Sequence, residues 1–143
     1  MEQHCETTAK KHIYAYSSIK LLVKTMKRFP SIKKNSDFQK VYHTGNSHAN
    51  RQLVMYVRRV DGQETRIGIS VSKKVGNSIV RHRLTRLVRE SFRLHKNMLE
   101  TGLDIVVVAR AAAKDSDYKK IERAFLHLCG IHNIFKNRSE NND

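Results

Sequence analysis

The sequence is poor in cysteine, in long apolar runs and in negative charge, and each shortage excludes a class of protein. Two cysteines, Cys5 and Cys129, are too few for a disulfide framework, so we expect a reducing cytoplasm. No apolar run approaches the ~18 residues of a membrane-spanning helix, and the N-terminus lacks the uninterrupted apolar core of a secretory signal. No stretch resembles a glycine-rich nucleotide-binding loop. A cytoplasmic protein without membrane association is therefore expected.

Basic residues outnumber acidic ones by 28 to 13, which gives a formal net charge of +15 and points to a polyanionic partner. The excess is uneven. Residues 66–96 hold nine Lys and Arg and one acidic residue, whereas residues 97–143 hold seven of each. The contact surface is therefore expected upstream of a scaffolding C-terminal third. At 143 residues and 39% hydrophobic, the chain suits one domain with an ordinary core.

Residues 66–94 read as a strand, a basic turn and an amphipathic helix. Apolar residues alternate over residues 66–72, with the period of a β-strand. Gly76 relaxes the backbone of the turn, and Asn77 or Ser78 can cap the helix that follows. The rest of the chain is interpreted around this unit.

The helix separates apolar from basic side chains. At ~100° per residue, one side carries Val80, Leu84, Leu87, Val88, Ser91 and Leu94. The opposite side carries His82, Arg86, Arg89 and Arg93, flanked by Arg81 and Arg83. Like charges one turn apart repel, and a bound polyanion would relieve that repulsion. Lys73 and Lys74 lie beside the helix N-terminus, which also favours an anion. We therefore favour nucleic-acid binding over an ordinary solvated basic face.

The other elements follow from similar patterns. We expect a helix at 37–43, capped by Asn35 or Ser36 and ended by Gly45. A loop and a strand at 51–60 follow, and Asp61-Gly62 would return that strand as a hairpin into strand 66–72. Residues 103–109 are typical of a strand buried on both faces. A last helix at 118–132 would bury a stripe made of Tyr118, Ile121, Phe125, Leu128 and Ile131. The order αβββαβα predicts an α+β protein in two layers.

Two aromatic residues of the first helix allow two interpretations. Phe38 and Tyr42 lie on one face, and on sequence alone core packing is the better one. The other interpretation is a platform on which unpaired bases stack. Val54 and Tyr56 make the second face of strand 51–60 partly apolar, so they could form the floor of a groove.

The domain is expected at residues 28–135. Residues 1–27 show no sustained helical pattern and are interpreted as a flexible arm or as a stretch outside the native protein, with Met26 as the alternative start. Residues 136–143 are expected to form a disordered tail.

Four alternatives compete with this interpretation of the basic helix. His48 and His82 could act as general acid and base, but neither is paired with a carboxylate in a motif. His127, Cys129 and His132 could bind zinc, but side chains with this spacing on one helix do not meet at a point. A non-catalytic ribosomal or RNA-chaperone-type protein would share the charge and the fold, and this alternative stays open. A helix-turn-helix is disfavoured because the basic helix follows a strand.

Four stretches resemble the protein component of bacterial ribonuclease P. They are KKNSDFQKVY at 33–42, ANR at 49–51, GISVSKKVGN at 68–77 and RHRLTRLVRE at 81–90. The basic helix alone is a weak signal. A lysine pair, a Gly-Asn turn and an arginine-rich helix in one register, with the Asp-Phe helix upstream, make a specific one over residues 28–132.

The resemblance implies a ribosomal-protein-like fold with a mixed sheet and a left-handed β-α-β crossover, against the usual hand. It implies that a catalytic RNA removes the 5′ leader of precursor tRNA with Mg²⁺ held mainly by the RNA. The protein, a monomer on its own with no catalytic or metal-binding residue, would hold both RNAs. Together with the helix stripe, the expected RNA contacts are Lys73, Lys74, Asn77, Arg81, His82, Arg83, Arg86, Arg89 and Arg93. The implied leader cleft is lined by Phe38, Tyr42, Val54 and Tyr56. The family usually has Asn in place of His82 and Lys in place of Thr85.

Overall fold

The computed structural model describes residues 30–62 and 64–137. The chain divides into residues 1–30 and 31–143, and every element named below belongs to the second part. The predicted extension at 1–27 lies outside the described residues, as does most of the predicted tail. The elements are α2 (Asn35–Thr44), β1 (Asn46–Ala49), β2 (Leu53–Arg59), β3 (Arg66–Ser70), α3 (Ser78–His95), β4 (Leu103–Ala109) and α4 (Tyr118–Ile131). The predicted α+β class and the order αβββαβα are confirmed.

The four strands form one mixed sheet in the order β1-β2-β4-β3. β2 runs antiparallel to β1 and β4, and β3 runs parallel to β4. The predicted hairpin that pairs β2 with β3 is therefore wrong. Gly62 does turn the chain, with φ +73°, but β4 lies between the two strands. β4 takes this inner position because it is buried on both faces, which only a covered central strand can be.

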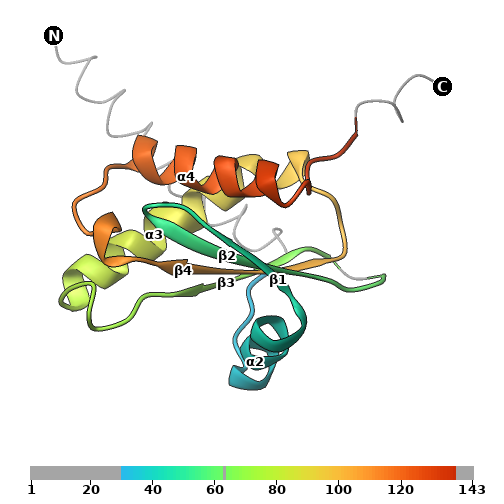
Figure 1. The fold of residues 1–143 in the computed structure, drawn as a ribbon, viewed down its shortest axis with the longest axis horizontal. Coiled ribbons are helices and arrows are strands. Elements are labelled where there is room, and N and C mark those ends of the chain that lie inside the picture. Colours follow the sequence, from blue (N-terminus) through green and yellow to red (C-terminus); the bar gives the residue numbers. More distant parts are fainter. Residues whose placement is uncertain (1–29, 63, 138–143) are drawn as a thin grey trace, which may run out of the picture. The chain divides into compact units, whose positions relative to one another are not determined.

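The parallel neighbours β3 and β4 are joined by α3, because parallel strands need a crossover connection. α3 and α4 lie on one face of the sheet and α2 lies on the other (Figure 1). The main core lies under α3 and α4, where Phe92 and Phe125 are fully buried. Among the described residues, no helix is long and apolar enough to cross a bilayer.

The face beneath α2 has a smaller core. Ile32, Val41 and Val106 form a buried cluster there, and partly exposed aromatic rings pack around it. β2 follows the predicted alternation, since Leu53, Met55 and Val57 are buried while the residues between them are half-buried. One face of β2 thus belongs to the main core and the other to the surface beside α2.

Two predictions about the start of the domain are wrong in detail. The residue before α2 is Lys34, and its side chain makes no capping hydrogen bond, so neither Asn35 nor Ser36 is the cap. The loop predicted before strand 51–60 contains a further strand, β1, which pairs with β2 along its whole length. Its four residues, NSHA, are all exposed, so no apolar alternation marks it as a strand.

The predicted Asn77 cap of α3 is confirmed, and the apolar stripes of the two longer helices are confirmed in part. The Asn77 side chain accepts a hydrogen bond from the Val80 N–H, and Asp117 accepts one from the Lys120 N–H. The predicted stripes end too late, because Leu94 and Ile131 are exposed. Both residues lie in the last turn of their helices.

Asn50, in the loop between β1 and β2, connects three parts of the fold. Its side-chain oxygen accepts hydrogen bonds from the N–H groups of Gln52 and Leu53 at 3.2 and 2.9 Å. Its side-chain nitrogen donates to the carbonyl of Ala124 in α4 at 2.9 Å. Its own carbonyl accepts from Arg110, at the end of β4, at 2.8 Å. Asn50 is therefore a structural residue of the ANR stretch.

We expect Asn50→Ala to lower the free energy of unfolding by about 2–3 kcal/mol, because three net hydrogen bonds of about 1 kcal/mol each are lost. Urea titration of the two proteins measures this. Asn46→Ala, at an exposed position of β1, is the control and should change stability by less than about 0.5 kcal/mol. Equal stability of Asn50→Ala and the unmodified protein would show that these bonds do not hold the loop.

Candidate nucleic-acid interface

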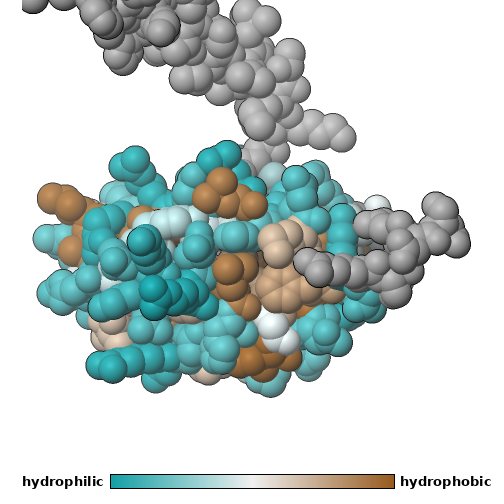
Figure 2. All heavy atoms as spheres, turned by 90° about the horizontal axis from the view of Figure 1, so that it is seen from above, coloured by the Kyte–Doolittle hydropathy of each residue, from teal (hydrophilic) through white to brown (hydrophobic). Residues whose placement is uncertain are grey.

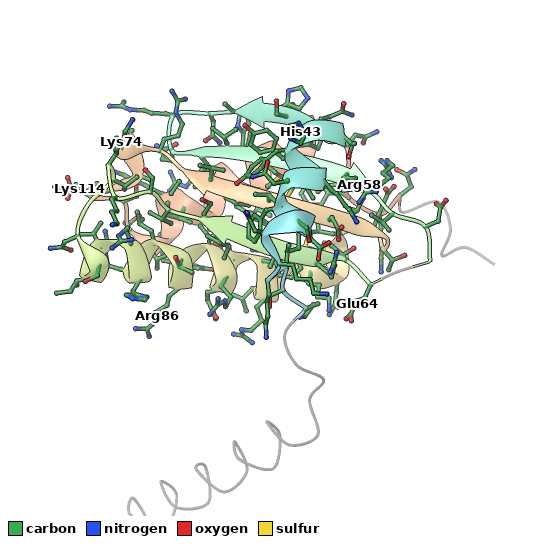
Figure 3. All side chains as sticks on the ribbon, turned by 90° about the horizontal axis from the view of Figure 1, so that it is seen from below. His43, Arg58, Glu64, Lys74, Arg86 and Lys114 are labelled. Atoms are coloured by element: carbon green, nitrogen blue, oxygen red, sulfur yellow. The ribbon has the colours of Figure 1, made fainter. Side chains whose placement is uncertain are left out.

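α3 presents a buried side and a basic side, as its sequence predicts. Leu84, Val88, Ser91 and Phe92 are buried against the sheet and α4. On the other side His82, Arg86, Arg89 and Arg93 are exposed. Arg86 points away from the rest of the domain (Figure 3). The Asn77 cap fixes where the helix begins, so it also fixes which side chains share this basic face.

The nine predicted contacts all lie on α3 or on the turn before it. Lys73, Lys74 and Asn77 are exposed in that turn, and Arg81 is half-buried at the first turn of the helix. Thr85, where the family usually has Lys, donates to the Arg81 carbonyl at 2.9 Å. This departure replaces a cation by a hydrogen bond inside the helix.

Carboxylates neutralise one part of the surface and leave another part positive. Among the described residues, ion pairs join Arg59 to Glu100, Arg66 to Asp104 and Lys96 to Glu64. All three lie at the end of the sheet where β2 ends and β3 begins. On α3, Arg93 pairs with Glu90, and this interaction raises the pKa of the arginine and lowers that of the glutamate.

At the N-terminal part of α3 the positive charge is not balanced in this way. Within residues 30–62 and 64–137, no carboxylate lies within 4.0 Å of the charged groups of Lys73, Lys74, Arg81 or Arg86. These side chains repel one another unless an external anion is present. A polyphosphate chain matches this arrangement, because guanidinium groups bind phosphate in a bidentate way and released counterions add to affinity.

Three further basic residues, which are not among the nine predicted contacts, lie at the end of the sheet where β3 and β4 end. Arg51 precedes β2, and Arg110 and Lys114 follow β4; the register places these positions beside the end of β3. Lys114 lies at the same end of the sheet as Lys74, opposite Arg58 and Glu64 (Figure 3). Residue spacing does not reveal their proximity, because only the strand order brings these residues together.

Phe38, Tyr42 and Tyr56 form a cluster on the α2 side of the sheet, which we call the aromatic platform. The rings of Phe38 and Tyr42 lie 6.4 Å apart, and Tyr42 meets Tyr56 edge to face at 4.9 Å. All three are half-buried, so they are neither full core nor free surface. Val54 is half-buried on the same face of β2, and Val108 of β4 adds to it. The rings therefore pack on a small core and also reach the surface, and the stacking of bases on them stays a prediction.

Gly68 and Arg66 hold α2 over the sheet. A Cβ on Gly68 would lie 2.7 Å from the ring of Phe38, so glycine leaves the space in which this ring packs against β3. Arg66 donates two hydrogen bonds to Asp104, at 3.0 and 2.9 Å, and lies 3.8 Å from Asp37 in the first turn of α2. The platform is therefore fixed to β3 at two points.

The residues of the alternative chemistries are occupied in other ways. The His48 ring lies against that of His132, which hydrogen-bonds to the Met55 carbonyl, and burial is the main cause of the lowered pKa of His132. Cys129 is fully buried, and burial raises the pKa of its thiol to about 12. Such a thiol does not readily become the thiolate that zinc needs. Among the described residues, no three His, Cys, Asp or Glu side chains could hold a metal ion together.

The surface seen from α4 is mostly hydrophilic, with apolar side chains in separate groups (Figure 2). The domain combines a mixed sheet, one cationic helix face and a partly exposed aromatic platform. These features are typical of the class of small basic proteins that bind nucleic acid.

Comparison with known proteins identifies the family within this class. The Ribonuclease P family model matches residues 26–132. The ribonuclease P protein component of Lachnoclostridium phytofermentans is 52% identical over 104 residues, which are 73% of this chain and 90% of that protein. The corresponding protein of Alkaliphilus metalliredigens is 50% identical over 97 residues, or 68% and 87% of the two chains.

Solved structures agree. The RNase P protein of Staphylococcus aureus is 42% identical, with a TM-score of 0.69 over 74% of this chain and 97% of that one. The RNase P protein of Thermotoga maritima is 30% identical, with a TM-score of 0.64 over 68% and 93% of the two chains. This chain belongs to the family of ribonuclease P protein components, as its motifs indicate.

Proposed function

We propose that this protein binds the catalytic RNA of ribonuclease P and the 5′ leader of precursor tRNA, and so assists the endonucleolytic removal of the leader in the cytoplasm. The observation that carries the proposal is the positive charge of Lys73, Lys74, Arg81 and Arg86, which no carboxylate of the described residues neutralises within 4.0 Å. This charge lies in one domain with the aromatic platform. The basic face would contact phosphates of the catalytic RNA. The platform would stack unpaired leader bases, because every base has an apolar face.

The chemistry is assigned to the RNA partner. Mg²⁺ takes oxygen ligands, mostly carboxylates, phosphates and water. Glu90 is the acidic residue of α3, and it is already paired with Arg93. The residues of this face therefore do not fit a protein-held Mg²⁺ site, and we expect the ion to be held by RNA.

Reconstitution tests this assignment. Purified protein, freed of RNA, is added to precursor tRNA at low Mg²⁺ with and without the catalytic RNA. We expect the protein alone to be nearly inert and the mixture to remove the leader. Cleavage by the protein alone would assign the chemistry to the polypeptide. A protein that binds RNA but does not restore cleavage would instead be a general basic binder of the ribosomal or chaperone type.

We expect Tyr42→Leu to weaken binding of precursor tRNA by about 10-fold in the holoenzyme, since one stacked base contributes about 1–3 kcal/mol. Binding of mature tRNA, which has no leader, should be unchanged. The melting temperature should fall only slightly, because Tyr42 is half-buried. Val41→Ala is the matched control on the same helix. Val41 is fully buried, so its truncation should lower stability and leave leader affinity intact. The reverse pattern would show that Tyr42 is a core residue.

A further inference from the structure

Arg83 differs from the other arginines of α3 in what it contacts. Its Nη1 donates to the backbone carbonyl of Ser116 at 2.9 Å, and its Nη2 donates to the carbonyl of Lys114 at 2.5 Å. The side chain is exposed, so exposure alone would group it with the basic face. Its two terminal nitrogens are nevertheless already committed to acceptors within the protein.

Both acceptors belong to the connection between β4 and α4. This connection begins with a short 3₁₀ turn, Ala111–Ala113, and ends at the Asp117 cap of α4. Ser116 and Ala113 are buried and joined by a hydrogen bond from the Ser116 N–H to the Ala113 carbonyl at 3.0 Å. Arg83 thus binds the part of the connection that lies between the 3₁₀ turn and the cap of α4.

The geometry of these bonds needs a planar fork. A guanidinium presents parallel N–H groups that can reach two acceptors at once, whereas a lysine ammonium is a point charge on a flexible stem. Lysine would keep the charge at position 83 and lose the double connection. Charge and connection can therefore be separated by one substitution.

The connection carries Lys114. Because Arg83 binds the carbonyl of Lys114 itself, it fixes the position of that residue relative to α3. Lys114 lies at the end of the sheet where Lys74 lies (Figure 3). Both side chains follow the ends of the parallel neighbours β3 and β4.

We infer that Arg83 is a positioning residue, which holds the β4–α4 connection so that Lys114 extends the RNA-binding face beside Lys74. This inference rests on the proposed function. It assigns a phosphate contact to Lys114 and removes Arg83 from the set of direct contacts.

The test compares variants at positions 83, 86 and 114 by their affinity for the catalytic RNA over a range of salt concentrations. Each phosphate contact contributes about 0.7–0.9 to the slope of log K against log salt. Lys114→Gln should weaken binding several-fold and reduce the slope by about that amount. Arg83→Lys should weaken binding as much as Arg83→Gln, despite its retained charge. Arg86→Lys should keep the slope and lose only part of the affinity, because lysine keeps the charge but not the bidentate guanidinium, and Arg86→Gln should lose slope.

The decisive result is the double variant Arg83→Gln/Lys114→Gln. If Arg83 acts through Lys114, the second substitution adds little to the first, in affinity and in slope. Measurement at least 20 °C below the lowest melting temperature, on proteins with matched circular dichroism, excludes unfolding. Should Arg83→Gln fail to fold, Arg83→Lys takes its place in the double variant.

Two results would overturn the inference: wild-type affinity and slope for Arg83→Lys, or independent, multiplying effects of the two glutamine substitutions. An unchanged slope for Arg86→Gln would be a different failure. It would show that α3 is not the RNA-binding face, and so would contradict the proposed function itself.

Discussion

Replacing Arg86 and Arg89 by glutamate should reduce the affinity for the catalytic RNA by at least about 100-fold near physiological salt. A hydrogen bond to a charged group contributes about 1.5–3 kcal/mol, so the loss of two such contacts alone accounts for this factor. The two new carboxylates would also repel phosphates. The slope of log K against log salt should fall by about 1.4–1.8, the contribution of two phosphates. Filter binding or fluorescence anisotropy at several salt concentrations measures both quantities.

A matched control lies on α4. Lys119 and Arg123 are exposed basic residues of this helix. They carry the same charge as Arg86 and Arg89 and lie at a similar spacing. Their replacement by glutamate changes the net charge of the protein by the same amount. We expect affinity to change by less than about threefold, through long-range charge alone. If both double variants lose equal affinity, net charge governs binding, and no particular face of the protein does.

Arg66→Met should lower the free energy of unfolding by about 3 kcal/mol, the largest effect that we expect from the loss of a single ion pair. The side chain of Asp104 is only 3% exposed and receives two hydrogen bonds from Arg66. Removal of the arginine leaves a buried carboxylate without its partner, which typically costs 3–5 kcal/mol. α2 also loses the contact between Asp37 and Arg66, so leader binding should weaken in the same variant. Denaturant unfolding and precursor tRNA binding test the two effects.

Arg59→Met is the control for this prediction. Arg59 pairs with Glu100 at the same end of the sheet, but its side chain is 63% exposed. An exposed pair contributes less than about 1 kcal/mol, so this substitution should have a small effect. Adding Asp104→Leu to Arg66→Met should recover part of the lost stability, because no unpaired charge then remains. If Arg59→Met and Arg66→Met lower the free energy of unfolding by equally small amounts, the burial of Asp104 does not make the loss of its partner more costly.

The sequence alone was sufficient for α3 because its signals are local. A cap at Asn77, apolar residues one turn apart and basic residues on the opposite side all act within the helix itself. The same holds for β4, whose nearly continuous apolar run correctly indicated burial on both faces. These two elements determine where the basic face lies, so the position of that face could be predicted from residue spacing.

The strand order could not be predicted in this way. Asp61-Gly62 is a sound turn signal, and the turn forms. Strand pairing, however, depends on which strand buries the most apolar surface at the centre of the sheet. β4 is the more apolar strand, and it separates β2 from β3. The roles of Arg83 and Lys114 depend on that order, since β4 carries the connection that Arg83 binds. β1 was missed because a polar edge strand has no apolar pattern.

The most direct measurement of the central claim is chemical modification of arginines by a dicarbonyl reagent, read by mass spectrometry with and without the catalytic RNA. Arg86, on the basic face of α3, should be strongly protected by the RNA. Arg59 and Arg123, which are exposed elsewhere on the domain, should react equally in both samples. Protection of Arg59 or Arg123 with Arg86 still reactive would place the RNA on another face and contradict the account.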